Sequence, residues 1–402
     1  QMTRHSGCSR GLDEVLVGLA VSGCSMDFVR YAGLVPGESV HLSKTDLRQL
    51  LDRVAAAGLM VRHSAGGTVA NSLANYTHLS GEPAVLLGAI QNRIAPGDPA
   101  FSYVAQTPGA LSLDYLSAID GQTGIALTFI TPDGERSFGV APGVSGDYRT
   151  SSLPVDVIKN ASVVVCSAYL LSDMDRPIAS AAIELMDIAN EAQIPVAFAM
   201  GTAGLVLKHK EMLTDLIRDK ASIVAMNSSE ASALTGETDP LLACEKVLDL
   251  ADMAVVTQGS KGLYLAGYTD ESVARPTKAA VRSKAIPEYN KWEYSRLVRK
   301  ADCTGPMKIY SHTHPYRGGP GTLYNTSGAG DAALAAILHD LVSNSYHRSL
   351  VPSSYKHSNE LPFFSYSSLS RNAQYGNRVA YEILITSSPR LNSPIGSDSE
   401  SG

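Results

Sequence analysis

The sequence has few cysteines and lacks a long hydrophobic run. Its five cysteines are an odd number, lie far apart and form no C-x-x-C pair. This pattern excludes a zinc ribbon and the disulfide framework of a small secreted protein, so a reduced, cytoplasmic compartment is expected. No stretch reaches the roughly 18 uninterrupted apolar residues that a bilayer span requires, and we expect no membrane partner.

A strong charge of one sign is also missing. The 402 residues include 33 basic and 39 acidic side chains, which gives a formal charge of −6. Such mild acidity gives no reason to expect a nucleic acid or an anionic lipid as partner. Hydrophobic residues make up 44% of the chain, as in ordinary globular proteins, and the length allows one large or two ordinary domains.

The apolar run Val15–Cys24 needs a separate interpretation. It resembles the short core of an export signal that ends in a lipoprotein-type cysteine. Asp13 and Glu14 stand where such a signal carries positive charge, and the run is short. We therefore interpret Val15–Val21 as a buried first strand.

Short, β-branched apolar runs alternate with helical patterns along most of the chain. Near-continuous apolar strands separated by helices predict an α/β fold in which helices cover both faces of a mostly parallel sheet. The further expected strands are Ala84–Ile90, Ser162–Cys166, Pro195–Met200, Ser222–Met226 and Met253–Thr257. The expected helices are Thr45–Ala57, Thr68–Leu79, Arg176–Ala192, Lys208–Asp219 and Asp239–Leu250.

Four segments depart from this alternation. Residues 124–140 read as a β-hairpin around Pro132-Asp-Gly-Glu135, and an exposed extended piece is expected at about 28–42. Together, residues 28–42 and 120–142 are expected to form a small β-strand lid. Residues 268–310 read as a polar insertion, and the Ser/Pro/Gly-rich tail at 387–402 is expected to be flexible.

The sequence Gly328-Ala329-Gly330-Asp331 leads directly into an Ala/Leu-rich helix. Glycines at a helix start leave backbone N–H groups accessible, and these amides and the helix dipole favour a phosphoryl group. A carboxylate there is suited to take a proton from an attacking hydroxyl. Three plainer interpretations remain at this point: a dinucleotide fingerprint, a helix cap and a packing turn.

Two further patterns are suited to hydroxyl groups of a ligand. Gly66-Gly67 opens a helix in which Asn71 follows one turn later, so that a ligand hydroxyl can approach backbone and amide together. Asp27 follows the expected first strand, and a carboxylate accepts two hydrogen bonds from a vicinal diol. The plainer interpretations are a tight turn and a solvated turn residue.

Two other patterns are suited to the phosphate donor. Asn227-x-x-Glu230 follows an expected strand and suits a water-coordinated Mg²⁺, although N-x-x-E is also a common capping box. Thr257-Gln-Gly259-Ser-Lys-Gly262 reads as a strand, a turn and a strand that flank an adenine.

These motifs, in this order, resemble the ribokinase (phosphofructokinase-B) superfamily over essentially the whole chain. The resemblance implies a single ribokinase-like domain, with a three-layer αβα core and a small β-strand lid. Longer strings resemble the branch of the superfamily that acts on inosine and guanosine. These strings include residues 225–243, Asn344-Ser-Tyr-His-Arg-Ser349 and Ser388-Pro-Arg-Leu391.

The resemblance implies transfer of phosphate from Mg·ATP to the 5′-hydroxyl of inosine or guanosine, in purine salvage. The implied catalytic residues are the base Asp331, the anion hole Gly328, Ala329 and Gly330, and the lid residue Arg136. The implied nucleoside contacts are Asp27, Gly66, Gly67 and Asn71, with Ser22 and Thr202 as candidates. The implied Mg·ATP contacts are Asn227, Glu230, Thr257, Gly259 and Gly262.

Several alternatives stay open from the sequence. Superfamily members usually begin the late motif with Asp, whereas this chain has Asn325, which leaves activation by K⁺ open. An adenosine or sugar kinase and a catalytically silent purine-nucleotide sensor are the competing functions. Homodimer formation and feedback by guanine nucleotides are also undecided.

Overall fold

The computed structural model describes residues 9–22, 24–31, 33–34, 39–59, 61–131, 136–278, 280, 286, 289–318, 328–357, 360–386 and 388–391. Asn325 lies outside these residues, as does the turn at 132–135 of the expected hairpin. The side chains of Ser22 and Arg136 also lie outside them, although both residues belong to strands.

The core is a ten-stranded sheet with the order β16-β14-β13-β12-β11-β10-β1-β5-β6, and β7 also pairs with β5. All its strand pairs are parallel except β13–β14 and β14–β16. The strands are β1 Ser9–Leu12, β5 Ala84–Gln91, β6 Leu111–Ser112, β7 Leu116–Ile119, β10 Val163–Ser167, β11 Val196–Ala199, β12 Ile223–Asn227, β13 Met253–Thr257, β14 Leu263–Asp270 and β16 Pro306–Thr313. The expected mostly parallel sheet is therefore present.

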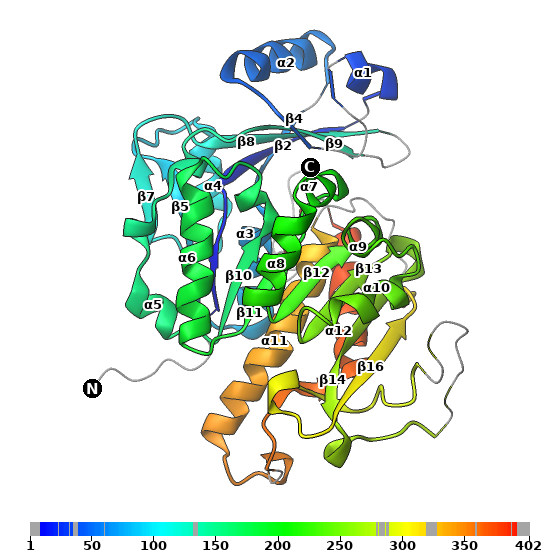
Figure 1. The fold of residues 1–402 in the computed structure, drawn as a ribbon. Coiled ribbons are helices and arrows are strands. Elements are labelled where there is room, and N and C mark those ends of the chain that lie inside the picture. Colours follow the sequence, from blue (N-terminus) through cyan, green and yellow to red (C-terminus); the bar gives the residue numbers. More distant parts are fainter. Residues whose placement is uncertain are drawn as a thin grey trace, which may run out of the picture.

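Helices cover both faces of this sheet (Figure 1), because alternate side chains of each strand point to opposite sides. Val163 and Val165 belong to one apolar cluster and Val164 and Cys166 to the other. The first cluster includes α3 Thr68–Ser80, α11 Ala329–Leu350 and α12 Leu369–Leu384. The second includes α6 Pro177–Glu191, α7 Ala203–Lys208, α8 Lys210–Lys220, α9 Ser228–Thr235 and α10 Pro240–Val247. Short helices α4 Pro99–Gln106 and α5 Val155–Lys159, and the strand pair β15 Arg296–Val298 and β17 Phe363–Ser368, complete the core.

A second sheet of five strands lies across one end of the core (Figure 1). Its order is β3-β9-β8-β2-β4, with the bounds β2 Leu16–Ser22, β3 Ser39–His41, β4 Val61–Ala65, β8 Gly124–Ile130 and β9 Arg136–Ala141. Helices α1 Met26–Tyr31 and α2 Lys44–Ala56 lie on its outer side. We call these five strands the lid sheet; it contains β2 and β4 in addition to β8 and β9 of the expected hairpin. The expectation of an extended piece at 28–42 was wrong in part: Ser39–His41 form β3, whereas Phe28–Tyr31 belong to helix α1.

The expected first strand therefore forms, but it belongs to the lid sheet. The first strand of the core is β1, whose sequence Ser-Arg-Gly-Leu has no apolar pattern, although all four residues are buried. Gly11 makes this position in the core possible, because a Cβ atom there would lie 2.4 Å from Val69 of α3. Close packing of strand and helix, rather than hydrophobic periodicity, places β1 in the sheet.

The C-terminal segment also differs from the expectation. A flexible tail is expected from residue 387, but Ser388–Leu391 pack against α3, where the backbone N–H of Leu391 donates to Asn75 Oδ1 at 2.7 Å. Residues 392–402 lie outside the described residues. The expected insertion at 268–310 begins in β14 and ends in β16, which pair as antiparallel neighbours.

Candidate active site

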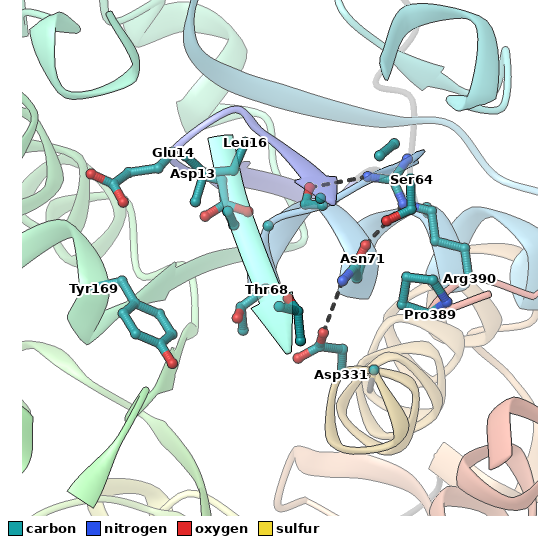
Figure 2. Close-up of a pocket in the computed structure, with 18 of the residues that line it drawn as sticks. Asp13, Glu14, Leu16, Ser64, Thr68, Asn71, Tyr169, Asp331, Pro389 and Arg390 are labelled. Atoms are coloured by element: carbon teal, nitrogen blue, oxygen red, sulfur yellow. Dashed lines mark hydrogen bonds between the residues drawn. The ribbon is translucent and has the colours of Figure 1, made fainter. Parts of the chain in front are cut away.

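A cavity of about 1370 Å³ lies between the lid sheet and the carboxyl ends of the parallel strands. Ligands of open α/β sheets bind at this edge, because loops and helix N-termini meet there. Its walls include small lid residues, the residues after β1, the start of α3, the start of α11 and residues 388–391. Figure 2 shows the side chains that point into it, among them Asp13, Thr68, Asn71, Asp331 and Arg390.

The start of α11 forms one wall of the cavity. Gly328 is the N-cap residue with φ +79°, and a Cβ atom there would lie 2.6 Å from the carbonyl oxygen of Pro389. Only glycine fits such a backbone angle and such a close approach without strain. Among the described residues, no atom outside the helix's own backbone lies within 4 Å of a hypothetical Cβ on Gly330. The N–H groups of this first turn lack intrahelical acceptors.

Asp331 extends from this first turn into the cavity (Figure 2). Its Oδ2 accepts a hydrogen bond from Asn71 Nδ2 of α3 at 3.2 Å. Burial raises the pKa of Asp331 to about 7, while the hydrogen bond from Asn71 and the charge of Arg390 act in the opposite direction. A carboxyl group with this pKa exchanges a proton readily near neutral pH, which is what a general base requires.

Asp27 does not lie in this cavity, so the structure corrects its expected place. Its side chain is 94% exposed on α1 and faces Arg30 at 3.9 Å. Asp13, which directly follows β1, lines the cavity instead and is 3% exposed. The apolar run that resembles the first core strand is β2 of the lid sheet, so the carboxylate that follows it, Asp27, lies away from the cavity.

Asp13 is held by the start of α3. Its Oδ2 accepts a hydrogen bond from the backbone N–H of Ala70 at 2.8 Å. Burial, together with the nearby carboxylates of Glu14 and Asp331, raises the pKa of Asp13 to about 8. In the sequence, the only indication that Asp13 belongs to a site is its position before an apolar run, and this indication is weak.

The double glycine before α3 allows this contact. Gly66 and Gly67 both line the cavity. Gly67 has φ +95°, and a Cβ atom there would lie 2.3 Å from Asp13 Oδ2. A side chain at this position would therefore displace the carboxylate and block the approach of a ligand to the backbone.

Asn227 and Glu230 form the capping box that was the plainer interpretation of their spacing. Asn227 Oδ1 accepts from the backbone N–H groups of Ser229 and Glu230, and Glu230 Oε2 accepts from the N–H of Asn227 at 2.9 Å. Both residues nevertheless line the cavity. Burial raises the pKa of Glu230 to about 7, and the charge of Asp331 adds to this effect.

The other expected contacts divide into two groups. Thr202 lines the cavity and caps α7, where its Oγ1 accepts from the N–H of Leu205 at 3.3 Å. Thr257, Gly259 and Gly262 form the expected strand, turn and strand but do not line the cavity. Gly262 has a packing role, because a Cβ atom there would lie 2.0 Å from the carbonyl oxygen of Thr313. Thr257 pairs with Asn227 and so lies at the same edge of the sheet.

Arg390 is a cavity residue that was not singled out from the sequence, where it belonged to the expected tail. It is 6% exposed, and its Nε donates to Asn71 Oδ1 at 2.9 Å (Figure 2). The string Ser-Pro-Arg-Leu shared with the resembling kinases was the signal that pointed to it.

The cavity gathers four buried or partly buried carboxyl groups with raised pKa values, those of Asp13, Glu14, Glu230 and Asp331. Such a cluster favours protons or cations. No group of three or more His, Cys, Asp or Glu side chains that could hold a metal ion is found in the described part of the chain.

Among the described residues, no helix is long and apolar enough to cross a membrane.

Comparison with known proteins gives consistent matches. The chain matches the model of the pfkB family carbohydrate kinases over residues 40–283. The guanosine-inosine kinase of Escherichia coli (strain K12) is 39% identical over 382 residues, which cover 95% of this chain and 87% of the relative.

Solved structures share the fold at much lower identity. The adenosine kinase of Sinorhizobium meliloti has a TM-score of 0.72 at 18% identity, with 98% of this chain and 97% of that chain covered. A probable sugar kinase from Rhizobium etli has a TM-score of 0.70 at 17% identity, with 98% and 96% covered. These likenesses support the three-layer fold and the lid.

Proposed function

This chain belongs to the pfkB family of carbohydrate kinases, and from this we propose that it transfers the γ-phosphoryl group of ATP to the 5′-hydroxyl of guanosine and inosine. One observation carries the proposal: the 39% identity to a guanosine-inosine kinase extends over 95% of the chain. The products would be the purine nucleoside monophosphates, as in purine salvage.

Asp331 is the proposed general base. The side chain lines the cavity at the N-terminus of α11, and its pKa of about 7 lets it accept the proton of the attacking hydroxyl at neutral pH. The N–H groups of the first turn, at Gly328, Ala329 and Gly330, are the proposed partners of the charge that develops on the phosphoryl group. In-line attack then needs positioning more than covalent chemistry.

Asp13, Gly67 and Asn71 are the proposed ribose contacts, with Asp13 in the place first expected for Asp27. Asp13 and Asn71 offer a carboxylate and an amide to a vicinal diol, and Gly67 lets it approach the backbone between them in the sequence. The lid sheet closes the cavity on the outer side, where small residues such as Gly18 and Ala20 leave room for the nucleoside. A closed lid would keep water from the phosphoryl group, and Arg136 of β9 remains the proposed lid arginine.

The residues at the end of β12 fit a magnesium ion. Mg²⁺ prefers oxygen ligands and keeps several waters, and Glu230 offers a carboxylate in the cavity whose pKa is raised partly by the charge of Asp331. A bound cation would relieve that repulsion. Asn227 and Glu230 would hold the hydrated ion, which neutralises phosphate charge when bound. Thr257, Gly259 and Gly262 remain the proposed neighbours of the ATP base.

The proposal is tested by a substrate panel. The purified chain is incubated with Mg·ATP and, separately, guanosine, inosine, adenosine, ribose or fructose, with and without K⁺, and the 5′-monophosphates are separated by chromatography. We expect guanosine and inosine monophosphate as the main products. Phosphorylation of ribose or fructose alone would refute the substrate assignment, and tight nucleotide binding without any product would favour a sensor.

A further inference from the structure

The segment Ser388–Leu391 is fixed to α3 by several hydrogen bonds. The N–H of Leu391 donates to Asn75 Oδ1 at 2.7 Å, and Asn75 Nδ2 donates to the carbonyl oxygen of Pro389 at 3.3 Å. The N–H of Arg390 donates to Ser388 Oγ at 3.1 Å. The side chain of Arg390 then lies between Asn71 of α3 and Tyr103 of α4.

The guanidinium group of Arg390 is buried among neutral acceptors. Besides Asn71, it donates to Thr107 Oγ1 at 3.2 Å and to the carbonyl oxygen of Gly66 at 3.3 Å, and it lies 5.6 Å from the ring centre of Tyr103. No carboxylate of the described residues lies within 4 Å of it. A buried cation without an ion-pair partner is costly, so its charge must be balanced at longer range.

Arg390 fixes the orientation of the Asn71 amide. An arginine side chain only donates hydrogen bonds, so the atom of Asn71 that faces Nε of Arg390 must be the oxygen. The amide nitrogen of Asn71 then faces Asp331, to which it donates. A flipped amide would present its oxygen to the carboxylate, which is repulsive.

We propose that Arg390 is a positioning residue for phosphoryl transfer, which through Asn71 and through its charge holds Asp331 ionised and directed into the cavity. This inference rests on the proposed function, because it assigns Asp331 the role of base. It adds a contribution from the C-terminal segment to a site otherwise built from the two sheets and their helices.

The electrostatic surroundings of Asp331 support the inference. The titratable and charged groups that face it are Asp13 after β1, Tyr169 after β10, Glu230 of α9 and Arg390. The carboxyl groups of Asp13 and Glu230 repel its negative charge when they are ionised, whereas Tyr169 stays neutral because burial raises the pKa of its phenol. The hydrogen bond from Asn71 and the charge of Arg390 lower the pKa of Asp331. Loss of Arg390 removes both favourable effects, so the pKa of Asp331 should rise.

The test compares Arg390→Met, Arg390→Gln and Arg390→Lys with the wild type. For each, kcat with guanosine is measured from pH 5.5 to 9, and the Asp331 carboxyl group is titrated by ¹³C NMR, with Asp331→Asn identifying its signal. In the Met and Gln variants we expect the acid limb and the carboxyl titration to move to higher pH by about 0.5 unit or more. Arg390→Lys keeps the charge, so its acid limb and carboxyl titration should lie close to those of the wild type.

The control is Arg378→Met on α12, which removes the same charge from an exposed side chain that faces Glu382; its titration should match the wild type. In the double variant Asn71→Ala with Arg390→Met, the rise in the pKa of Asp331 should be smaller than the sum of the rises in the two single variants, because both residues act through one chain of hydrogen bonds.

An unchanged titration in Arg390→Gln, or equal shifts in the Lys and Met variants, would overturn the positioning role. The Gln variant keeps a polar group in this buried place and is the fallback if the Met variant does not fold. The NMR titration needs no turnover, so it decides this inference even if the wild type phosphorylates no nucleoside, in which case the proposed function fails by itself.

Discussion

Replacing Asp331 by asparagine should lower activity and raise stability at once. Asparagine has nearly the same shape and still accepts the hydrogen bond from Asn71, but it cannot take a proton. If Asp331 is the base, turnover with guanosine should fall by about 10²–10⁴-fold, the range typical of a lost general base. The nucleoside KM should change little.

The stability gain follows from the pKa of the carboxyl group. The pKa is near 3.8 in the unfolded chain and about 7 in the folded protein, so the folded protein binds the extra proton between these values. Its stability therefore falls as the pH rises through this window, and the cost is complete above about pH 7. The difference between these two pKa values corresponds to a gain of at most ~4 kcal/mol in the free energy of unfolding. Because cavity water screens the charge, we expect the variant to gain about 1–2 kcal/mol.

The assay is urea unfolding of the wild type and Asp331→Asn at pH 5 and pH 8. The variant should gain more at pH 8 than at pH 5, because only the wild type carries the buried charge at pH 8. Asp52→Asn, which changes an exposed carboxylate on α2, is the control and should show no such dependence. Equal stability differences at the two pH values, or near-normal turnover of the variant, would refute the reasoning.

Three further substitutions test neighbouring parts of the site. Gly67→Ala should raise the guanosine KM, measured by steady-state kinetics, by about tenfold or more, because its Cβ would lie 2.3 Å from Asp13 Oδ2. The control is Gly97→Ala, which has a similar φ of +96° but no atom of the described residues within 4 Å of its Cβ; its KM should equal that of the wild type. Asp13→Asn should raise the nucleoside KM, whereas Asp27→Asn should leave it as in the wild type, and the reverse result would restore the original expectation. Glu230→Gln, which keeps the capping box, should raise the Mg²⁺ concentration for half-maximal activity, measured by Mg²⁺ titration at fixed ATP; no change would exclude Glu230 from the ion's surroundings.

Much of the fold could be predicted from hydrophobic pattern. The strands β5, β10, β11, β12 and β13 form within a residue or two of the expected ranges, because each is an apolar run buried on both faces of the sheet. β1 could not be found in this way. It is four residues long with a buried Arg10, and its place depends on the contact of Gly11 with α3.

That missed strand explains the misplaced carboxylate. A motif such as Gly-Ala-Gly-Asp fixes both a local backbone geometry and a reactive group, so Asp331 could be named from four adjacent residues. The carboxylate proposed to contact ribose was expected from its position after the first core strand, and here the strand that looks like the first belongs to the lid sheet. Asp13 and Asp27 are both acidic, and local sequence could not separate them.

The sequence alone determined the alternation of strands and helices, the glycine-bordered helix start that carries Asp331, and the likeness to nucleoside kinases, because each is written in adjacent residues. The tertiary structure decided which strands form the core and which the lid, that Asp13 enters the cavity, and that Arg390 reaches Asn71 across 319 positions of the chain. These outcomes depend on strand pairing and close packing between distant segments, and no local pattern encodes them.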